Sequence, residues 1–182
     1  MTETQTPNSI LATWNALDAP TAAEAILPCN GSRAWADQLA ALRPFQTAFD
    51  LTCTADIVWR SLDEPAWQQA FDSHPRIGER HAKAATALSP EAKAQSLQWS
   101  STEQSAAQLT ADTEAALAAA NLAYEEKFGR IFIISATGKT AAEMLAILQQ
   151  RLKNDPQTEL REAVEQQRQI TQLRLRKWLA AS

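Results

Sequence analysis

Residues 111–134 read ADTEAALAAANLAYEEKFGRIFII, and this stretch decides the fold class. Its first part, up to Phe128, is rich in Ala, Leu and Glu, which favour helix, and Gly129 follows where a helix would end. Ile131 to Ile134 is the single stretch of the chain that resembles a strand. Because one short strand has no partner for a sheet, we interpret it as a buried connection, helical or extended. The stretch therefore predicts an all-α fold.

The rest of the chain has the same helical composition. Its 182 residues include only 4 Gly, with 45% hydrophobic and 21% charged residues, as in an ordinary globular protein. No internal repeat divides the chain, so we predict a single all-α domain, a bundle of about eight helices, over residues 1–182. Residues 1–8 and 180–182 are expected to be frayed, and residues 80–89 to form a mobile loop.

Capping patterns and prolines predict where the helices begin and end. A Ser or Thr followed three residues later by Glu is a capping box, in which each side chain bonds the other residue's backbone N–H. Three such patterns predict helix starts: Thr21-x-x-Glu24, Ser100-x-x-Glu103 and Thr140-x-x-Glu143. Pro20 and Pro44 are expected to end the helices that precede them.

The apolar pattern predicts which side chains face the core. On the helix expected over residues 45–62, the inward positions at helical spacing are Phe49, Thr52, Cys53 and Ile57, with Trp59 as a further candidate. The two cysteines, Cys29 and Cys53, form neither a disulfide framework nor a zinc pattern, so both are expected to be small buried side chains in a reducing compartment. The six tryptophans are expected to anchor helix contacts.

Charge and motif patterns argue against several classes of function. The net charge of −4 argues against nucleic acid as a partner, because phosphate binding needs a basic face. No apolar run approaches the roughly 18 residues of a membrane span, and residues 1–8 lack the layout of a secretion signal, so the cytoplasm is the expected location. Gly138-Lys139-Thr140 lacks the earlier glycine of a phosphate loop, since Ile133 stands there. No residue cluster has metal-ligand spacing, so we expect no metal.

His74 is the residue that residue type and position single out for chemistry. It is one of two histidines, and an imidazole, with an ordinary pKa of about 6.5, exchanges protons near neutral pH. Pro75 favours extended backbone before it, so His74 is expected in a loop carried by helices, a common place for a catalytic group. A purely structural role in a turn or cap remains an alternative. His81, the other histidine, is expected to be solvated.

Glu103 and Arg174 each allow two interpretations. Glu103 either only completes a capping box or, at a helix N-terminus with Ser100, Ser101 and Gln104, contributes to a site for an anionic or amide-like substrate. Arg174 stands between two leucines. It is therefore either solvated, or it reaches a pocket and holds a carboxylate with two hydrogen bonds.

Several motifs follow one another in a fixed order along the chain. They are Phe71-x-x-His74-Pro75-Arg76-Ile77-Gly78-Glu79, Ser100-x-x-Glu103-Gln104, Asn121-x-x-Tyr124-x-x-x-Phe128-Gly129-x-x-Phe132-Ile133-Ile134, Arg151-Leu152-x-Asn154 and Ile170-x-x-x-Arg174-Leu175. Together they resemble the 2-oxo-4-hydroxy-4-carboxy-5-ureidoimidazoline (OHCU) decarboxylase family over nearly the whole chain. The resemblance implies an all-helical, cofactor-free carboxy-lyase, often a homodimer, that converts OHCU into (S)-allantoin and CO2 in uric acid degradation.

The resemblance also implies the roles of individual residues. His74 matches the catalytic histidine, and Glu103 matches a second acid/base group. The positions implied to bind substrate are Pro75, Ser100, Ser101, Thr102, Gln104, the backbone of Phe132, Ile133, Ile134, Ser135 and Ala136, and Arg174. Two other functions stay open: a non-catalytic helical interaction module on the same fold, and a decarboxylase for another ureido acid.

Overall fold

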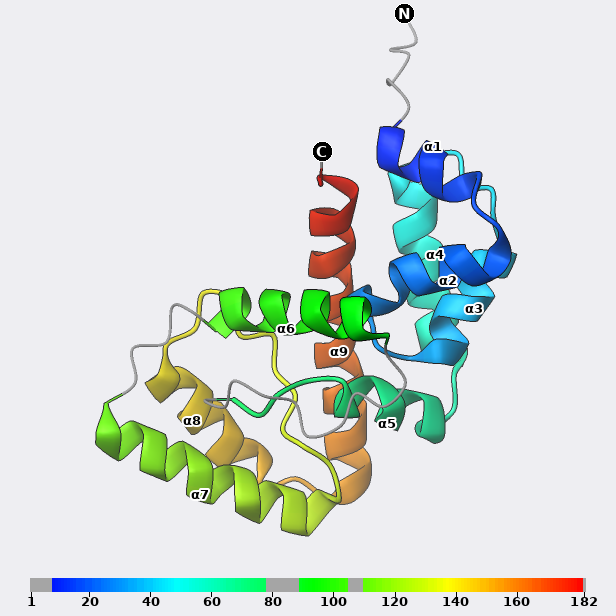
Figure 1. Cartoon of the computed structure of the whole chain (residues 1–182). Coiled ribbons are helices and arrows are strands. Elements are labelled where there is room, and N and C mark those ends of the chain that lie inside the picture. The colour runs from blue at the N-terminus through cyan, green and yellow to red at the C-terminus, as the bar shows by residue number, and fades with distance from the viewer. Residues whose placement is uncertain (1–7, 78–88, 105–109, 182) are drawn as a thin grey trace, which may run out of the picture.

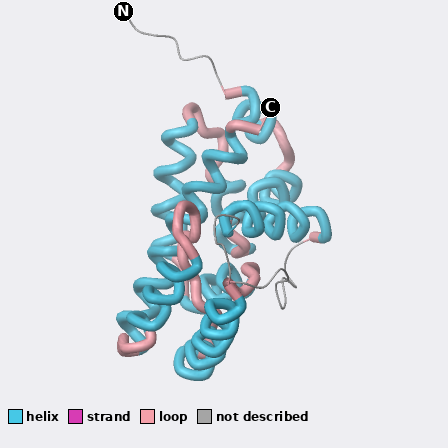
Figure 2. Tube along the Cα trace, turned by 90° about the vertical axis from the view of Figure 1, so that its left-hand side faces the viewer, coloured by secondary structure: helices cyan, strands magenta, loops and turns pink. Residues whose placement is uncertain are grey.

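The computed structural model describes residues 8–77, 89–104 and 110–181, without the side chain of Gln104. Across these ranges the chain forms helices joined by loops, with no strand (Figure 2). The elements are α1 Ser9–Asn15, α2 Ala19–Ile26, the 3-10 helix η1 Leu27–Cys29, α3 Arg33–Ala41, α4 Ala48–Ser61, α5 Glu64–Asp72, α6 Pro90–Gln104, α7 Ala111–Phe128, α8 Ala141–Arg151 and α9 Pro156–Leu179. The all-α prediction is confirmed.

Some segments to which the predictions refer lie outside the described residues. The expected mobile loop at 80–89 falls outside the described residues except for residue 89, and His81 lies outside them as well. Most of the expected frayed N-terminus lies outside too, but Asn8 is described: its side chain caps α1 and donates a hydrogen bond to the carbonyl of Leu179 at 3.0 Å. Among the described helices, none has the length and apolar character needed to cross a membrane.

The helix α9 runs through the middle of the molecule (Figure 1), and the buried apolar side chains form two cores. One core is formed by α1 to α5 and η1 together with α9, and Trp14, Trp35 and Trp59 are fully buried in it, as expected for anchors. The second core is formed by α7, α8 and the connection between them. The helix α6 lies across α9, where Arg174 contacts Ser96 and Ser100.

The first expected capping box does not start a helix. The helix α2 begins earlier, at Ala19, because the carboxylate of Asp18 accepts a hydrogen bond from the backbone N–H of Thr21 at 3.0 Å. Pro20 lies in the first turn of this helix, a position that needs no backbone N–H, so it does not end the preceding helix. That helix, α1, has already ended at Asn15. A nearby Asp therefore caps in place of Thr21.

The second expected box, at Ser100 and Glu103, is also wrong. These residues lie in the last part of α6, which begins after Ser89, where the hydroxyl of Ser89 accepts from the N–H of Ala92 at 3.2 Å. Glu103 therefore caps no helix start, and no helix N-terminus offers an anion site there. The third box, at Thr140, is confirmed at the start of α8. The predicted end of α7 at Gly129, with a left-handed φ of 68°, is confirmed too.

The inward face predicted for α4 is wrong except at Trp59, which is buried. Phe49 and Ile57 are 74% and 67% exposed, and Cys53 is exposed as well, whereas Cys29 is buried as expected. The side chains that α4 buries are Leu51, Ala55, Val58 and Trp59. The helix carries two apolar stripes, and only the packing of α3 and α9 against one of them decides which is inside.

The connection between α7 and α8 is extended and buried, as the strand-like run predicted. Buried backbone outside a helix needs partners for its polar groups. Arg151 donates to the carbonyl of Ile133 at 2.7 Å, and the N–H of Ser135 donates to the side-chain oxygen of Gln166 at 2.9 Å. Side chains of α8 and α9 therefore hold residues 131–136 in place beside the site described next.

Candidate active site

His74 is placed by the end of α5 and by a glycine turn packed against it. Its N–H donates to the carbonyl of Phe71 at 3.1 Å, directly after the helix cap Ser73. Gly31 follows η1 with a φ of 96°, and a Cβ at Gly31 would lie 2.2 Å from the hydroxyl oxygen of Ser73. Only glycine allows this approach, so the turn after η1 determines where the backbone leading to His74 lies.

His74 and Glu103 face the same cavity. Its walls are formed by His74, Pro75, Ile77, Ser100, Glu103, Phe132, Ile133, Ile134, Ala136 and Ile170. The free volume is about 20 Å³, which is room for about one water molecule. The loop after α5, the end of α6 and the extended connection thus meet at one buried point. The structure brings together the two groups that the resemblance paired as catalytic.

The imidazole of His74 is uncharged at neutral pH. Burial, with a smaller contribution from the positive charge of Arg174, lowers its pKa from 6.5 to about 3, and the neighbouring Gln167 amide opposes the change only in part. The side chain is 8% exposed, and its Nε2 atom is buried without a hydrogen-bond partner. A neutral imidazole can accept a proton, so the site holds a base and not a cation at position 74.

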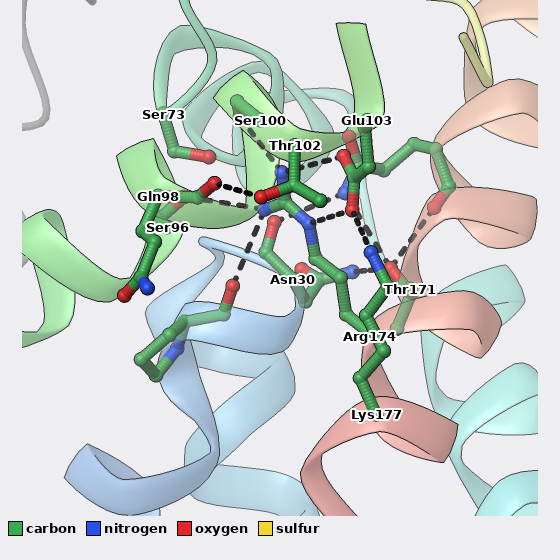
Figure 3. A network of polar contacts seen from close by, with 12 residues as sticks. Asn30, Ser73, Ser96, Gln98, Ser100, Thr102, Glu103, Thr171, Arg174 and Lys177 are labelled. Atoms are coloured by element: carbon green, nitrogen blue, oxygen red, sulfur yellow. Dashed lines mark hydrogen bonds and ion pairs between the residues drawn. The ribbon is translucent and has the colours of Figure 1, made fainter. Parts of the chain in front are cut away.

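The carboxylate of Glu103 is held by cations from α9 (Figure 3). Arg174 is fully buried, and its Nε and Nη2 atoms lie 3.3 and 3.2 Å from the two oxygens of Glu103. The same guanidinium donates to the hydroxyls of Ser100 at 2.9 Å and Ser96 at 3.1 Å. Lys177 lies 3.4 Å from Glu103 at the rim. The solvated interpretation of Arg174 is therefore wrong: it is buried and holds a carboxylate of the protein itself, and it is not among the residues that line the cavity.

Some predicted residues do not reach this cavity. Ser101 and Thr102 are exposed on α6, and the Thr102 hydroxyl donates to the carbonyl of Gln98 at 3.0 Å. Ser135 is not among the residues that line it; it lines a different cavity, and its N–H is already bonded to Gln166. The side chain of Gln104 lies outside the described residues.

The second cavity lies on the other side of the extended connection. It has a volume of about 530 Å³, is open to solvent, and is lined by Phe49, Thr52, Cys53, Asp56, Ser135, Thr137, Arg168, Gln169, Gln172, Leu173 and Arg176. Arg168 there is paired with Asp56 at 2.7 Å and Glu165 at 2.8 Å. No group of three His, Cys, Asp or Glu side chains in the described ranges is arranged to hold a metal ion.

Three buried polar residues at the site were missed by the sequence patterns. Asn30, Gln167 and Thr171 are all buried, and they are bonded to one another behind His74 and Arg174. The signal that could have found two of them is helical spacing: Gln167, Thr171 and Arg174 follow at steps of four and three, on one face of α9. Polar residues that share one buried face of a helix indicate a functional site, whereas polar residues on an exposed face need no such explanation.

A buried neutral imidazole and a paired carboxylate at one closed cavity are typical of enzymes that act on small polar molecules. The fold and the site therefore define the class as a helical small-molecule enzyme. The sequence model of the OHCU decarboxylase family matches residues 15–176, which is most of the chain. The chain belongs to the OHCU decarboxylase family.

Individual relatives agree with this assignment. The uric acid degradation bifunctional protein TTL of Arabidopsis thaliana is 36% identical over 151 residues, 82% of this chain, but the matched part spans only 44% of that protein. The 2-oxo-4-hydroxy-4-carboxy-5-ureidoimidazoline decarboxylase of Amia calva is 31% identical over 73% of each chain. A crystal structure of OHCU decarboxylase in the presence of (S)-allantoin has a TM-score of 0.71, with 33% identity, and covers 87% of this chain and 99% of its own.

Proposed function

We infer that this protein is an OHCU decarboxylase, a carboxy-lyase that converts 2-oxo-4-hydroxy-4-carboxy-5-ureidoimidazoline into (S)-allantoin and CO2. Within a chain of this family, the observation that supports the inference is the shared cavity of His74 and Glu103. A base and a cation-flanked carboxylate at one buried point are the groups that a decarboxylation with proton transfer needs.

The chemistry of OHCU explains what the protein must supply. One ring carbon carries both a hydroxyl and a carboxylate, and its neighbour is a C=N carbon that bears the ureido group. When CO2 leaves, the electron pair of the broken C–C bond moves into the C=N unit, and the ring nitrogen takes up a proton. Moving the hydroxyl proton to the ureido-bearing carbon then gives allantoin. The substrate accepts its own electrons, so we propose that no cofactor takes part.

We assign the proton transfer to His74. Because its imidazole is neutral, it can accept the hydroxyl proton and return it to one face of the ureido-bearing carbon. Delivery from one side produces a single enantiomer. Proton transfer of this kind typically contributes 10²–10⁴-fold in rate.

We assign to Glu103 the role of orienting the substrate and assisting His74. Arg174 and Lys177 hold the carboxylate at the cavity wall, where it can accept hydrogen bonds from the hydroxyl or ureido N–H groups of the substrate. Among the described residues, none accepts a hydrogen bond from the amide N–H of Ile134 or Ala136, and both residues line the cavity. We propose that these two amides bind the charge that develops on the substrate.

The cavity must open before the substrate can bind. Its free volume of about 20 Å³ is far smaller than a substituted imidazoline ring. The polar network of Arg174 fixes the wall formed by α6 and α9, and the contacts of Arg151 and Gln166 hold the extended connection, so we expect the wall formed by Pro75 and Ile77 to move.

The activity is tested with freshly generated OHCU, followed by circular dichroism. Wild-type protein, without any added cofactor, should speed the loss of OHCU and yield one allantoin enantiomer, whereas spontaneous decay yields a racemate. His74→Asn should lower kcat by at least about 10²-fold with the fold retained. His81→Asn, which changes the other histidine, is the matched control and should keep normal turnover. Absence of acceleration by the wild type would favour the non-catalytic interaction module, and normal turnover by His74→Asn would remove this imidazole from the mechanism.

Two further parts of the proposal concern the state of the protein in the cell. We propose that the protein is a homodimer, the state that the resemblance implies, and that it acts in the cytoplasm. Light scattering during size-exclusion chromatography tests the dimer, and a monomer mass at working concentrations would contradict it.

A further inference from the structure

Two of the buried side-chain atoms that lack a regular hydrogen-bond partner belong to His74 and to Gln167. They are Nε2 of His74 and Oε1 of Gln167. The Gln167 amide acts on the His74 imidazole and raises its pKa, in the direction expected of an acceptor facing a ring N–H. An unpaired buried acceptor is costly, so each atom is the natural partner of the other.

The neighbours of Gln167 decide which end of its amide faces His74. The hydroxyl of Thr171 donates its only proton to the backbone carbonyl of Gln167 at 2.9 Å, so toward side chains it can only accept. It accepts from Nδ2 of Asn30 at 2.9 Å and from Nε2 of Gln167 at 3.4 Å. The carbonyl of Asn30 also accepts from Nε2 of Gln167, at 3.1 Å. The amide nitrogen is thereby committed, and the oxygen remains free for His74.

We propose that Gln167 is a positioning residue for His74: its Oε1 atom accepts the Nε2 proton of the imidazole and fixes the ring in the neutral form whose Nδ1 is the base. The catalytic consequence rests on the decarboxylase function proposed above, but the tautomer does not. A neutral imidazole carries one donor and one acceptor nitrogen, and the partner of one nitrogen decides the state of the other.

The arrangement is rigid enough to set a tautomer. Gln167 and Asn30 are fully buried and Thr171 nearly so, and the chain of hydrogen bonds joins α9 to the turn after η1. The same turn, through Gly31, packs against Ser73 next to His74. The base and its orienting acceptor are thus fixed by the same piece of backbone. This is the pattern of a base oriented by a third group.

The proposal is tested by nitrogen NMR of the imidazole rings. The chain has only two histidines, so a His81→Gln variant assigns the spectrum. In the wild type at neutral pH, His74 should carry its proton on Nε2. Gln167→Met removes the acceptor at nearly constant volume and should give a mixture of tautomers. Gln169→Met, an exposed glutamine of the same helix, is the control and should leave the His74 signals unchanged.

Kinetics separate positioning from simple stability. Gln167→Met should lower kcat by about 10-fold, the effect expected for an orienting residue, with KM within about 2-fold. A wild-type His74 protonated on Nδ1 overturns the proposal even if the variant fails to fold. So does an unchanged tautomer in Gln167→Met, or a changed tautomer with unchanged kcat. If the wild type does not act on OHCU, the decarboxylase function fails, while the tautomer measurements still decide whether Gln167 positions His74.

Discussion

Two buried Arg–Glu pairs in the described part of the chain differ in how completely their hydrogen-bonding groups are satisfied. In the first, Arg151 bonds Oε1 of Glu159 at 2.8 and 2.5 Å, Tyr124 donates to the same oxygen, and Asn154 donates to the other at 2.8 Å. Glu159 is fully buried and lines neither of the two cavities described above. Both oxygens of this carboxylate accept hydrogen bonds from within the protein, so we assign the pair a structural role.

The second pair, Arg174 with Glu103, is looser. Its contacts are 3.2 and 3.3 Å, a second cation approaches at 3.4 Å, and the carboxylate lies at the wall of the cavity that His74 shares. A carboxylate with longer contacts keeps lone pairs available to a ligand. In this protein, the ion pair that we assign to function is therefore the one whose carboxylate borders a cavity.

The largest effect is expected from breaking the saturated pair. Arg151→Met leaves Glu159 as a buried charge without its cation, so the free energy of unfolding should fall by about 3–5 kcal/mol. Urea denaturation measures the change. Adding Glu159→Gln to Arg151→Met should recover part of the loss, because the buried charge is then removed. A fall of less than about 1 kcal/mol would show that the pair contributes little to stability.

Substituting the carboxylate in each pair should separate activity from stability. Glu103→Gln should lower kcat by about 10²-fold, because the substrate loses its anionic partner beside His74. Its free energy of unfolding should fall less than that of Glu159→Gln, since Ser96 and Ser100 still bond Arg174. OHCU turnover and urea denaturation of both variants give the result. Full activity in Glu103→Gln would show that this carboxylate, like that of Glu159, has only a structural role.

Alanine substitutions at two glycines test whether the turn after η1 positions His74. Gly31→Ala adds a Cβ at positive φ and against Ser73, whereas Gly138→Ala adds one at φ 79° with nothing within 4 Å. Gly138→Ala should therefore cost about 1–2 kcal/mol from backbone strain alone. Gly31→Ala should cost about 1–3 kcal/mol more from overpacking, and should also lower kcat as His74 shifts. Equal stability and unchanged kcat in the two variants would show that the turn does not position His74.

The smallest effect concerns pH. The pKa of His74 is about 3 in the folded protein and about 6.5 when unfolded, so the unfolded chain binds the proton more strongly between these values. Stability contributed by the neutral imidazole is complete above pH 6.5 and is lost as the pH falls toward 3. At pH 5.5 the loss should be about 1.4 kcal/mol. His74→Asn should show a flatter pH dependence in urea denaturation, and a profile identical to wild type would contradict the assigned pKa.

Parts of the fold could be predicted because their signals are local. The Ala-rich run before Gly129, the box at Thr140 and the isolated strand-like run at residues 131–134 all behave as their own sequence indicates. The helix starts predicted at Thr21 and Ser100 are wrong for different reasons. Near Thr21, Asp18 is the cap of α2, and Ser100 lies inside the longer helix α6. Capping patterns describe what a residue can do, and competition with its neighbours decides whether it does so.

The candidate site was predictable only in part. His74 could be singled out by residue type and loop position, but its partnership with Glu103 came from the resemblance to a family and not from spacing. The face of α4 that is buried, the burial of Arg174 and the network of Asn30, Gln167 and Thr171 had no decisive local signal. Each depends on which helix packs beside it.

The amino-acid sequence by itself determined the helical class, several helix ends and the family, because helix propensity, a glycine stop and ordered motifs are properties of neighbouring residues. Only the tertiary structure decided that Glu103 is held by Arg174, that Gln167 faces His74, and that one ion pair is saturated while the other borders a cavity. Those properties depend on burial and distance between segments far apart in the chain, and burial is what changes the pKa of an imidazole and the strength of an ion pair.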